Sequence, residues 1–254
     1  MQVDHISASG IKTFEQCELK YHVVYELKMK EESVHPNVRM GSAVHKMMEE
    51  ATNARKNNVP DKNLHDPMFW RDLAVQEYKV DRSLLSTIDE LVGNAQRWGY
   101  FRHIKRTAGC ELKIGFKTPD GTDVTGFIDR LDVMAPEADI IDLKTQKNAF
   151  EDDELKENWQ ARIYNIGARL LFPEITGTAS VSFWVLRHQV QRVILSARDA
   201  EEDIQRIQDQ VSKIKACNDP EASPSPLCQW CPNESGCKAN HGSARDRLRR
   251  MTRK

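Results

Sequence analysis

The 254-residue sequence lacks the features that mark membrane and secreted proteins. No run approaches the ~18 apolar residues of a membrane span, since the most apolar stretch, Ile166 to Leu186, contains Arg169, Pro173 and Glu174. The first residues, MQVDHISASG, do not combine a basic region with an apolar one, as a secretory signal does. We therefore expect a soluble, cytoplasmic protein that does not engage a membrane.

The sequence also lacks a nucleotide-binding loop and a large charge of either sign. Without a G-x4-GK[ST] motif, the chain encodes no ATPase motor. Its 37 Lys+Arg against 38 Asp+Glu give a net charge of −1, which argues against a uniformly basic nucleic-acid-binding domain. The charge is uneven, however, because Lys238 to Lys254 hold seven basic residues and one acid, a net charge of +6. This basic tail is either a solvated chain end or a source of phosphate contacts.

The spacing of apolar residues changes along the chain and predicts a mixed α/β fold. Helical spacing predicts helices at about 41–56, 69–101, 159–172 and 199–215, and a capped short helix within 7–17. Period-two spacing predicts strands at 111–116, 123–133, 140–144, 178–186 and 191–195. An acidic loop is expected at 151–157. This order predicts a mixed sheet flanked by helices.

Three of the six cysteines form the array Cys228-x2-Cys231-x5-Cys237 in a stretch rich in turn-forming residues. Three thiols within ten residues are poorly explained as scattered buried cysteines, so they indicate a metal centre. A fourth ligand would come from Cys17, Cys110 or Cys217, and spacing does not choose among these. Four thiolates suit either zinc or an iron–sulfur cluster.

Asp142 and Lys144 are two residues apart on a predicted strand and therefore project from the same face. An ordinary ion pair would explain them, but Asp129 ends the preceding strand and can reach the same corner. Two converging carboxylates repel unless a cation lies between them, and oxygen ligands favour Mg²⁺ or Mn²⁺. His45 on one helix, and Gln160 with Tyr164 on another, are weak signals when taken alone.

The order of these motifs is more informative than any single one. Gly41-x3-His45, Gly126-x2-Asp129, Asp142-x-Lys144 and Gln160-x3-Tyr164 follow one another, bracketed by Cys17 and the C-x2-C-x5-C array. This arrangement resembles the RecB-like nucleases of the PD-(D/E)XK superfamily, in the iron–sulfur branch. That branch includes CRISPR-associated RecB-like exonucleases, the nuclease domain of AddB-type helicase–nucleases and phage exonucleases. The resemblance extends from Cys17 to Cys237, and Asp142 stands where glutamate is also common.

The resemblance implies a role for each matched residue and a restriction-endonuclease-like core. A divalent metal, Mg²⁺ or Mn²⁺, would be bound by His45, Asp129, Asp142 and the backbone carbonyl of Leu143. Lys144 would act on the attacking water, and Gln160 and Tyr164 would hold the DNA strand and the geometry of the site. A [4Fe–4S] cluster would be bound by Cys17, Cys228, Cys231 and Cys237, as a structural clamp between the chain ends. Glu111 and Asp132 are candidates for supporting positions only.

The same resemblance gives the domain organisation and the function. We expect a single nuclease domain over 1–254, with cluster-forming segments 1–30 and 217–240, a helical region and catalytic core over 41–215, and the basic tail at 241–254. The expected activity is that of a metal-dependent DNA exonuclease in recombination, repair or phage DNA processing. Its partners would be single-stranded DNA or DNA ends, with a helicase or an annealing protein. The alternatives are a catalytically silent DNA-binding or scaffold subunit, and a zinc protein with four cysteine ligands.

Overall fold

The computed structural model describes Met1, residues 3–29, residues 35–226, and Cys228, Cys231, Asn233 and Cys237. The chain forms two compact units. Unit 1 comprises Met1–Ser33, Lys117–Val124 and Ile204–Lys254, and unit 2 comprises Val34–Phe116 and Thr125–Asp203. Both segments predicted to form the cluster, 1–30 and 217–240, belong to unit 1. The basic tail predicted at 241–254 lies outside the described residues.

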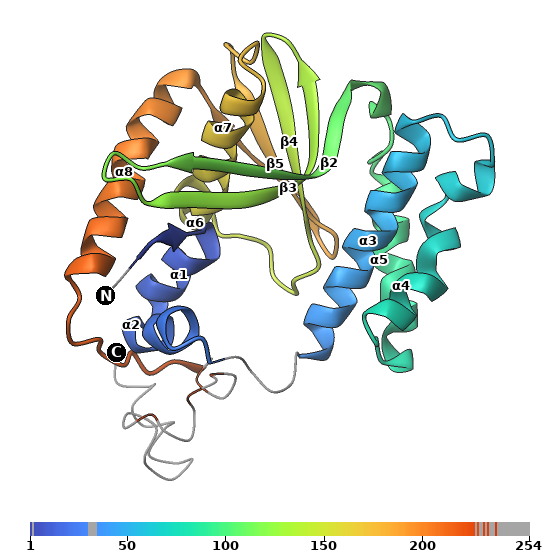
Figure 1. Ribbon diagram of the computed structural model, residues 1–254. Helices are drawn as coiled ribbons and strands as arrows, with labels where there is room; N and C mark the ends of the chain where they lie inside the picture. The colour runs from blue at the N-terminus through green and yellow to red at the C-terminus, as the bar shows by residue number, and fades with distance from the viewer. Residues whose placement is uncertain are drawn as a thin grey trace. The chain divides into compact units, whose positions relative to one another are not determined.

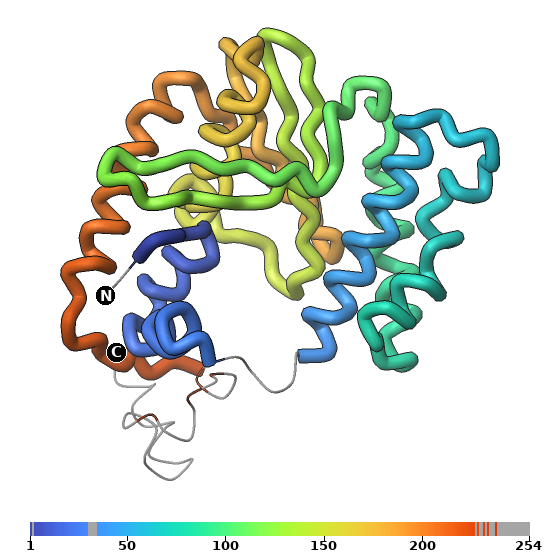
Figure 2. The backbone as a smooth tube through the Cα atoms, in the orientation of Figure 1, coloured from blue at the N-terminus to red at the C-terminus, as the bar shows by residue number. Residues whose placement is uncertain are grey.

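Unit 2 is built on a mixed sheet, which confirms the predicted α/β class. Strands β2 (Thr107–Lys117) and β4 (Glu137–Lys144) both pair with β3 (Asp123–Met134), as the backbone trace in Figure 2 shows. β4 is antiparallel to β3 and parallel to β5 (Ala179–Val185), and β6 (Gln189–Leu195) returns antiparallel to β5. β4 is therefore the central strand, with β3 and β5 as its neighbours.

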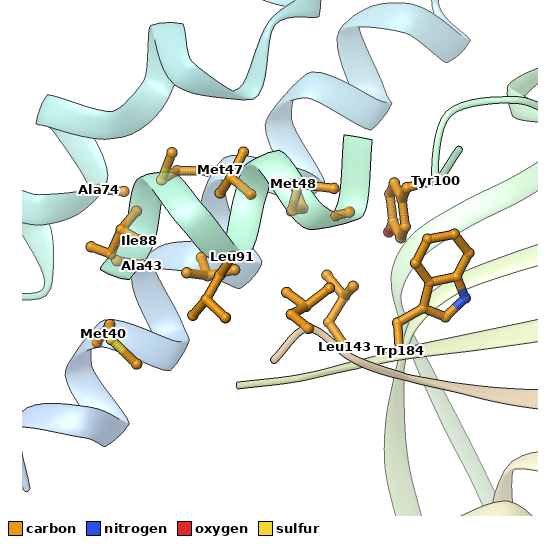
Figure 3. Packing of buried hydrophobic residues seen from close by; sticks show 14 of the residues in the cluster. Met40, Ala43, Met47, Met48, Ala74, Ile88, Leu91, Tyr100, Leu143 and Trp184 are labelled. Carbon is orange, nitrogen blue, oxygen red and sulfur yellow. The ribbon is translucent and has the colours of Figure 1, made fainter. Parts of the chain in front are cut away.

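Helices cover the two faces of this sheet (Figure 1). One face carries α3 (Pro36–Lys56), α4 (Arg71–Glu77) and α5 (Leu85–Arg97), and α7 (Trp159–Leu171) packs on β4, β5 and β6. Figure 3 shows side chains of α3 and α5 meeting Leu143 and Trp184 of the sheet. Because side chains alternate along β4, Ile141 and Leu143 enter this apolar core, whereas Asp142 and Lys144 face α7.

Two stretches of unit 2 differ from the sequence prediction. The helical region expected at 69–101 is divided into η3 (Pro67–Trp70), α4, η4 (Arg82–Leu84) and α5. The chain breaks after α4 because Lys79 adopts a left-handed conformation with φ of 50° and Asp81 accepts a hydrogen bond from the Ser83 amide. The acidic loop expected at 151–157 contains a short helix, α6 (Asp152–Lys156), whose first turn is acidic and so complements the helix dipole. The remaining short helices are η2 (Lys62–His65) and η5 (Ile104–Arg106).

Unit 1 contains β1 (His5–Ile6), α1 (Ala8–Gln16), α2 (Glu18–Tyr21) and the π-helix η1 (His22–Glu26). The Ser7 side chain accepts a hydrogen bond from the Gly10 amide and so caps α1, as predicted. β1 pairs in parallel with Asp123 and Val124 at the start of β3. The last helix, α8 (Ala197–Ala216), begins in unit 2 and continues into unit 1. Among the described residues, no helix is long and apolar enough to cross a membrane.

Candidate active site

Asp142 and Lys144 form an ion pair on the α7 side of β4. The Lys144 Nζ lies 2.7 Å from Asp142 Oδ2, and the Asp142 side chain is only 2% exposed. Burial raises the pKa of Asp142 to about 6, against the lowering effect of the lysine charge. The pair therefore places a carboxylate that burial destabilises beside a lysine whose side chain is 23% exposed.

Gln160 and Tyr164 hold the other oxygen of this carboxylate. Gln160 Nε2 donates to Asp142 Oδ1 at 2.8 Å, and Tyr164 Oη lies 3.4 Å from the same atom. The Gln160 carbonyl oxygen accepts from Lys144 Nζ at 2.8 Å. Asn158 fixes the start of α7 because its side chain accepts from the amides of Gln160 and Ala161. The two helix residues thus contact both members of the ion pair.

A second group of ligands lies on α3, β2 and β3. Ligand atoms of His45, Glu111 and Asp129 all lie within 4.8 Å of one another, the separation expected of residues that hold one cation. His45 Nδ1 is 3.4 Å from Asp129 Oδ1. One imidazole and two carboxylates form a donor set that suits Mn²⁺ or Mg²⁺, so these residues fit a divalent metal.

Asp129 links this group to β4. The β3–β4 ladder ends at the pair Arg130 and Ile141. Beyond this pair, the Leu143 amide donates a hydrogen bond to Asp129 Oδ2 at 2.6 Å. This hydrogen bond fixes the carboxylate beside the strand that carries Asp142. Leu143, whose backbone carbonyl is the expected ligand, is among the residues that line the neighbouring cleft.

Glu111 is the residue that the sequence analysis placed only in a supporting position. It lies within strand β2 but adopts a left-handed conformation with φ of 46°, which is uncommon for any residue other than glycine. Such backbone strain is characteristic of functional sites. The strand pattern around Glu111 predicts ordinary extended backbone, so the only available signal was a charged residue at the start of a strand.

Electrostatics in the ligand group reflect the crowding of its charges. Burial would lower the pKa of His45, but the charge and hydrogen bond of Asp129 outweigh it and raise that pKa to about 9. Burial raises the pKa of Glu111 to about 7, and the Asp129 charge adds to this. Carboxylates that repel one another in this way favour a bound cation.

Four of these residues, His45, Glu111, Leu143 and Lys144, line a cleft of about 680 Å³ between α3 and the segment that follows β4. Gly41 allows the close approach of its two sides, because a Cβ there would lie 2.9 Å from Thr145 Oγ1. This accounts for the glycine four residues before His45.

Asp132, the other supporting candidate, lies elsewhere. Both of its oxygens accept from the buried Arg130 guanidinium, at 2.8 and 2.6 Å, and Thr107 donates to it at 2.7 Å. A carboxylate satisfied in this way anchors the core. It is not among the residues that line the cleft.

The four cysteines assigned by resemblance line one small cavity of unit 1, together with Lys20 and residues 222–224. Backbone amides of Lys20 and Ser223 donate to Cys17 Sγ, each at 3.4 Å, and the Ser225 amide donates to Cys228 Sγ at 3.2 Å. Burial raises the pKa of the Cys231 thiol, and the neighbouring Cys17 and Cys228 raise it further. Within the described part of the chain, no three of these sulfurs come within 4.8 Å of one another.

A mixed α/β core with an imidazole, carboxylates and a lysine around one cleft has the chemistry of a metal-dependent hydrolase. The model of the PD-(D/E)XK nuclease superfamily matches residues 5–238, and the chain belongs to this superfamily. The family and the cleft support nuclease activity. No curated protein matches the sequence.

Two solved structures were compared with this chain, and one of them has a similar fold. A candidate exonuclease from Eubacterium rectale superposes with a TM-score of 0.54 at 16% sequence identity, covering 89% of this chain and 88% of that one. The protein SSO0001 gives a TM-score of 0.41 at 12% identity, covering 95% of this chain and 89% of that one. The Eubacterium rectale structure supports the fold assignment.

Proposed function

We propose that the chain is a metal-dependent DNA exonuclease of the RecB-like iron–sulfur branch. The observation that carries this proposal is that Lys144, the partner of the buried Asp142, lines the same cleft as His45 and Glu111. The ligand atoms of His45 and Glu111 converge there with those of Asp129. The proposal includes a role in recombination, repair or phage DNA processing. In that role the chain would work with a helicase or an annealing protein.

The ligand group would comprise His45, Glu111 and Asp129, with Asp142 and the Leu143 carbonyl next to them. When bound, a divalent cation supplies positive charge to the phosphodiester and makes water more acidic. The chain's own residues position the reactants. The Lys144 ammonium has three N–H donors, of which Asp142 and Gln160 accept two. The third is available to an attacking water or to a phosphate oxygen, where a compact cation stabilises developing negative charge.

Tyr164 and Gln160 act as positioning residues in this scheme. Tyr164 donates to the Phe127 carbonyl, and Gln160 Nε2 lies 2.5 Å from Tyr164 Oη. Gly126 makes room for this ring, because a Cβ there would lie 3.2 Å from Tyr164 Cε1. These hydrogen bonds tie α7 to β3 and β4, so that Asp142 and Lys144 keep their relative positions.

Digestion of end-labelled single- and double-stranded DNA with Mg²⁺ or Mn²⁺ tests the proposal. The wild type should release nucleotides from DNA ends, and Asp142→Asn should lose at least about 100-fold in rate, the scale of a lost electrostatic contact in a catalytic site. Asp72→Asn changes a carboxylate that is 92% exposed and serves as the matched control. An uncut substrate with the wild type and both metals would overturn the proposal.

The catalytically silent scaffold is the second candidate. A silent fold has no need to keep a lysine paired with a buried carboxylate, since a buried charge is costly. The scaffold interpretation would gain support if DNA stayed intact while the wild type and Asp142→Asn bound it equally.

We further propose that Cys17, Cys228, Cys231 and Cys237 bind a [4Fe–4S] cluster. They share one cavity, and amides donate to the sulfurs of Cys17 and Cys228, as hydrogen bonds do in iron–sulfur sites.

Iron, sulfide and zinc analysis of protein purified without oxygen distinguishes the two metals. A brown protein with iron that disappears in Cys231→Ala supports the cluster. Cys110→Ala is the control, because Cys110 lies in unit 2 and does not line the cavity. Stoichiometric zinc without iron would refute the cluster and leave the nuclease proposal standing.

A further inference from the structure

One row of side chains crosses three strands of unit 2 at the level of Asp142. Asp142 on β4 is the register partner of Phe183 on β5, and Phe183 is in turn the partner of Gln191 on β6. Register partners project from the same face of a sheet, so these three side chains are neighbours on the face that α7 covers. Phe183 is fully buried. The row therefore places an aromatic ring beside the carboxylate of the ion pair.

The Phe183 ring also lies against the ammonium of that pair. Lys144 Nζ is over the ring face, 5.7 Å from its centroid, within the distance at which an aromatic ring attracts a cation. The same nitrogen contacts Asp142 Oδ2 at 2.7 Å and Gln160 Oε1 at 2.8 Å. Because lysine has a long flexible stem that loses entropy when it is held, a further contact narrows the positions that the ammonium can take.

Phe150, in the segment between β4 and α6, packs on the same ring. The two ring centroids are 5.1 Å apart, within the range of favourable aromatic pairs. Gln191 holds Phe150 by its backbone: the Phe150 amide donates to Gln191 Oε1 at 2.9 Å, and Gln191 Nε2 donates to the Phe150 carbonyl at 2.8 Å. The Gln191 side chain thus pairs with both backbone groups of Phe150, as a neighbouring strand would.

Core packing alone would explain two phenylalanines in contact. It would not explain a cation against the face of one of them, because a charge near the core is costly unless it is compensated. Nor would it explain the side-chain amide of Gln191, which fixes the backbone of the other phenylalanine at two points. The arrangement forms a chain of contacts from Gln191 through Phe150 and Phe183 to Lys144.

We propose that Phe183 is a positioning residue for Lys144, and that Phe150 and the Gln191 amide hold its ring in place. The proposal rests on the proposed nuclease function, in which the Lys144 ammonium acts on the attacking water or on a phosphate oxygen. The ring restrains the ammonium before the substrate binds, so less order has to be created during the reaction. It also excludes water from part of the charge, and a less screened charge stabilises the transition state more strongly.

Fluorination of Phe183 separates the contact with the cation from core packing. Replacement by mono-, di- and trifluorinated phenylalanine weakens the negative ring face in steps and nearly keeps the ring shape. The single-turnover rate of cleavage should fall in the same steps, by about tenfold in all, while KM and the urea midpoint stay near the wild-type values. The same series at Phe69, which is 54% exposed and does not line the cleft, is the control. A constant rate, or one that falls only together with the urea midpoint, would overturn the proposal.

The clamp on Phe150 has its own conservative variant. Gln191→Glu keeps the size of the side chain and removes the donor to the Phe150 carbonyl. It should lower kcat about threefold, a part of the effect of one lost hydrogen bond. Gln189→Glu adds the same charge at an exposed position of the same strand and should leave kcat unchanged. Equal effects of the two substitutions would remove Gln191 from the proposed chain of contacts.

Nuclear magnetic resonance of the metal-free protein gives a readout that needs no cleavage. The ring current of Phe183 should shift the signal of the Lys144 methylene next to the ammonium, which is assigned by its loss in Lys144→Arg. Phe183→Leu should abolish this shift. A shift that is present although no metal-loaded protein cuts DNA would refute the nuclease function and leave the contact standing. Cleavage by the wild type without any such shift would refute the positioning role alone.

Discussion

Binding of a divalent cation at His45, Glu111 and Asp129 should release protons to solvent. A metal ligand must be deprotonated, so each group that carries a proton in the metal-free protein loses it on binding. The pKa of His45 is raised to about 9 and that of Glu111 to about 7. Both groups therefore hold protons in a pH range that is accessible to experiment.

The number of protons released follows from these two pKa values. At pH 7.5 about 0.97 proton remains on His45 and about 0.24 on Glu111, so binding should release about 1.2 protons. Metal binding is expected to release protons at every pH below 9, because the metal competes with protons for the same ligand atoms. The affinity for the metal therefore rises as the pH rises. The apparent association constant should increase about 16-fold from pH 7 to pH 8, as a release of about 1.2 protons requires.

Isothermal titration of the metal-free protein with Mn²⁺ at pH 7.5, in buffers of different ionisation enthalpy, measures this number directly. The slope of observed enthalpy against buffer enthalpy gives the protons released. His45→Asn should reduce the release, because it removes the group that carries most of the displaced proton, while Asp72→Asn leaves the release unchanged. A slope near zero in the wild type would refute the assignment of His45 and Glu111 as ligands.

Three further outcomes are expected. Lys144→Ala should abolish cleavage and leave the fold and the cluster intact, as judged by circular dichroism and iron content; full activity would show that the lysine has another role. Burial raises the pKa of Cys110 to about 12, so this thiol should resist alkylation by iodoacetamide at pH 8 in the folded protein and react after unfolding in urea. Leu91→Ala, in the fully buried core of α5, should lower the free energy of unfolding by about 2–5 kcal/mol in a urea titration; a loss below about 1 kcal/mol would contradict the described packing.

Much of the fold could be predicted because its signals are local. The strands at 111–116, 123–133 and 140–144 were expected from period-two spacing, and β2, β3 and β4 contain them. The division of the region 69–101 could not be found this way, because apolar residues recur at helical spacing on both sides of the break. Its cause is the left-handed Lys79 and the turn at Asp81, where local chemistry overrides periodicity.

The candidate site followed from the order of motifs along the chain. Spacing on β4 predicts that Asp142 and Lys144 share a face, and they do form an ion pair. The contacts made by Gln160 and Tyr164 depend on α7 crossing β4, which no local pattern specifies. Resemblance to a family supplied these two residues, and the structure supplies the hydrogen bonds that join them to Asp142.

Glu111 shows what a sequence pattern leaves out. Its neighbours have the alternating pattern of a strand. In an undistorted strand, its side chain would follow the alternation of β2 side chains between the two faces of the sheet. The left-handed backbone at this one residue re-aims the side chain, as a bulge does in other strands next to active sites. The carboxylate then joins His45 and Asp129, at the cost of strain and of repulsion between two carboxylates. Both costs are present in the metal-free protein, and a bound cation would relieve the repulsion between the two carboxylates.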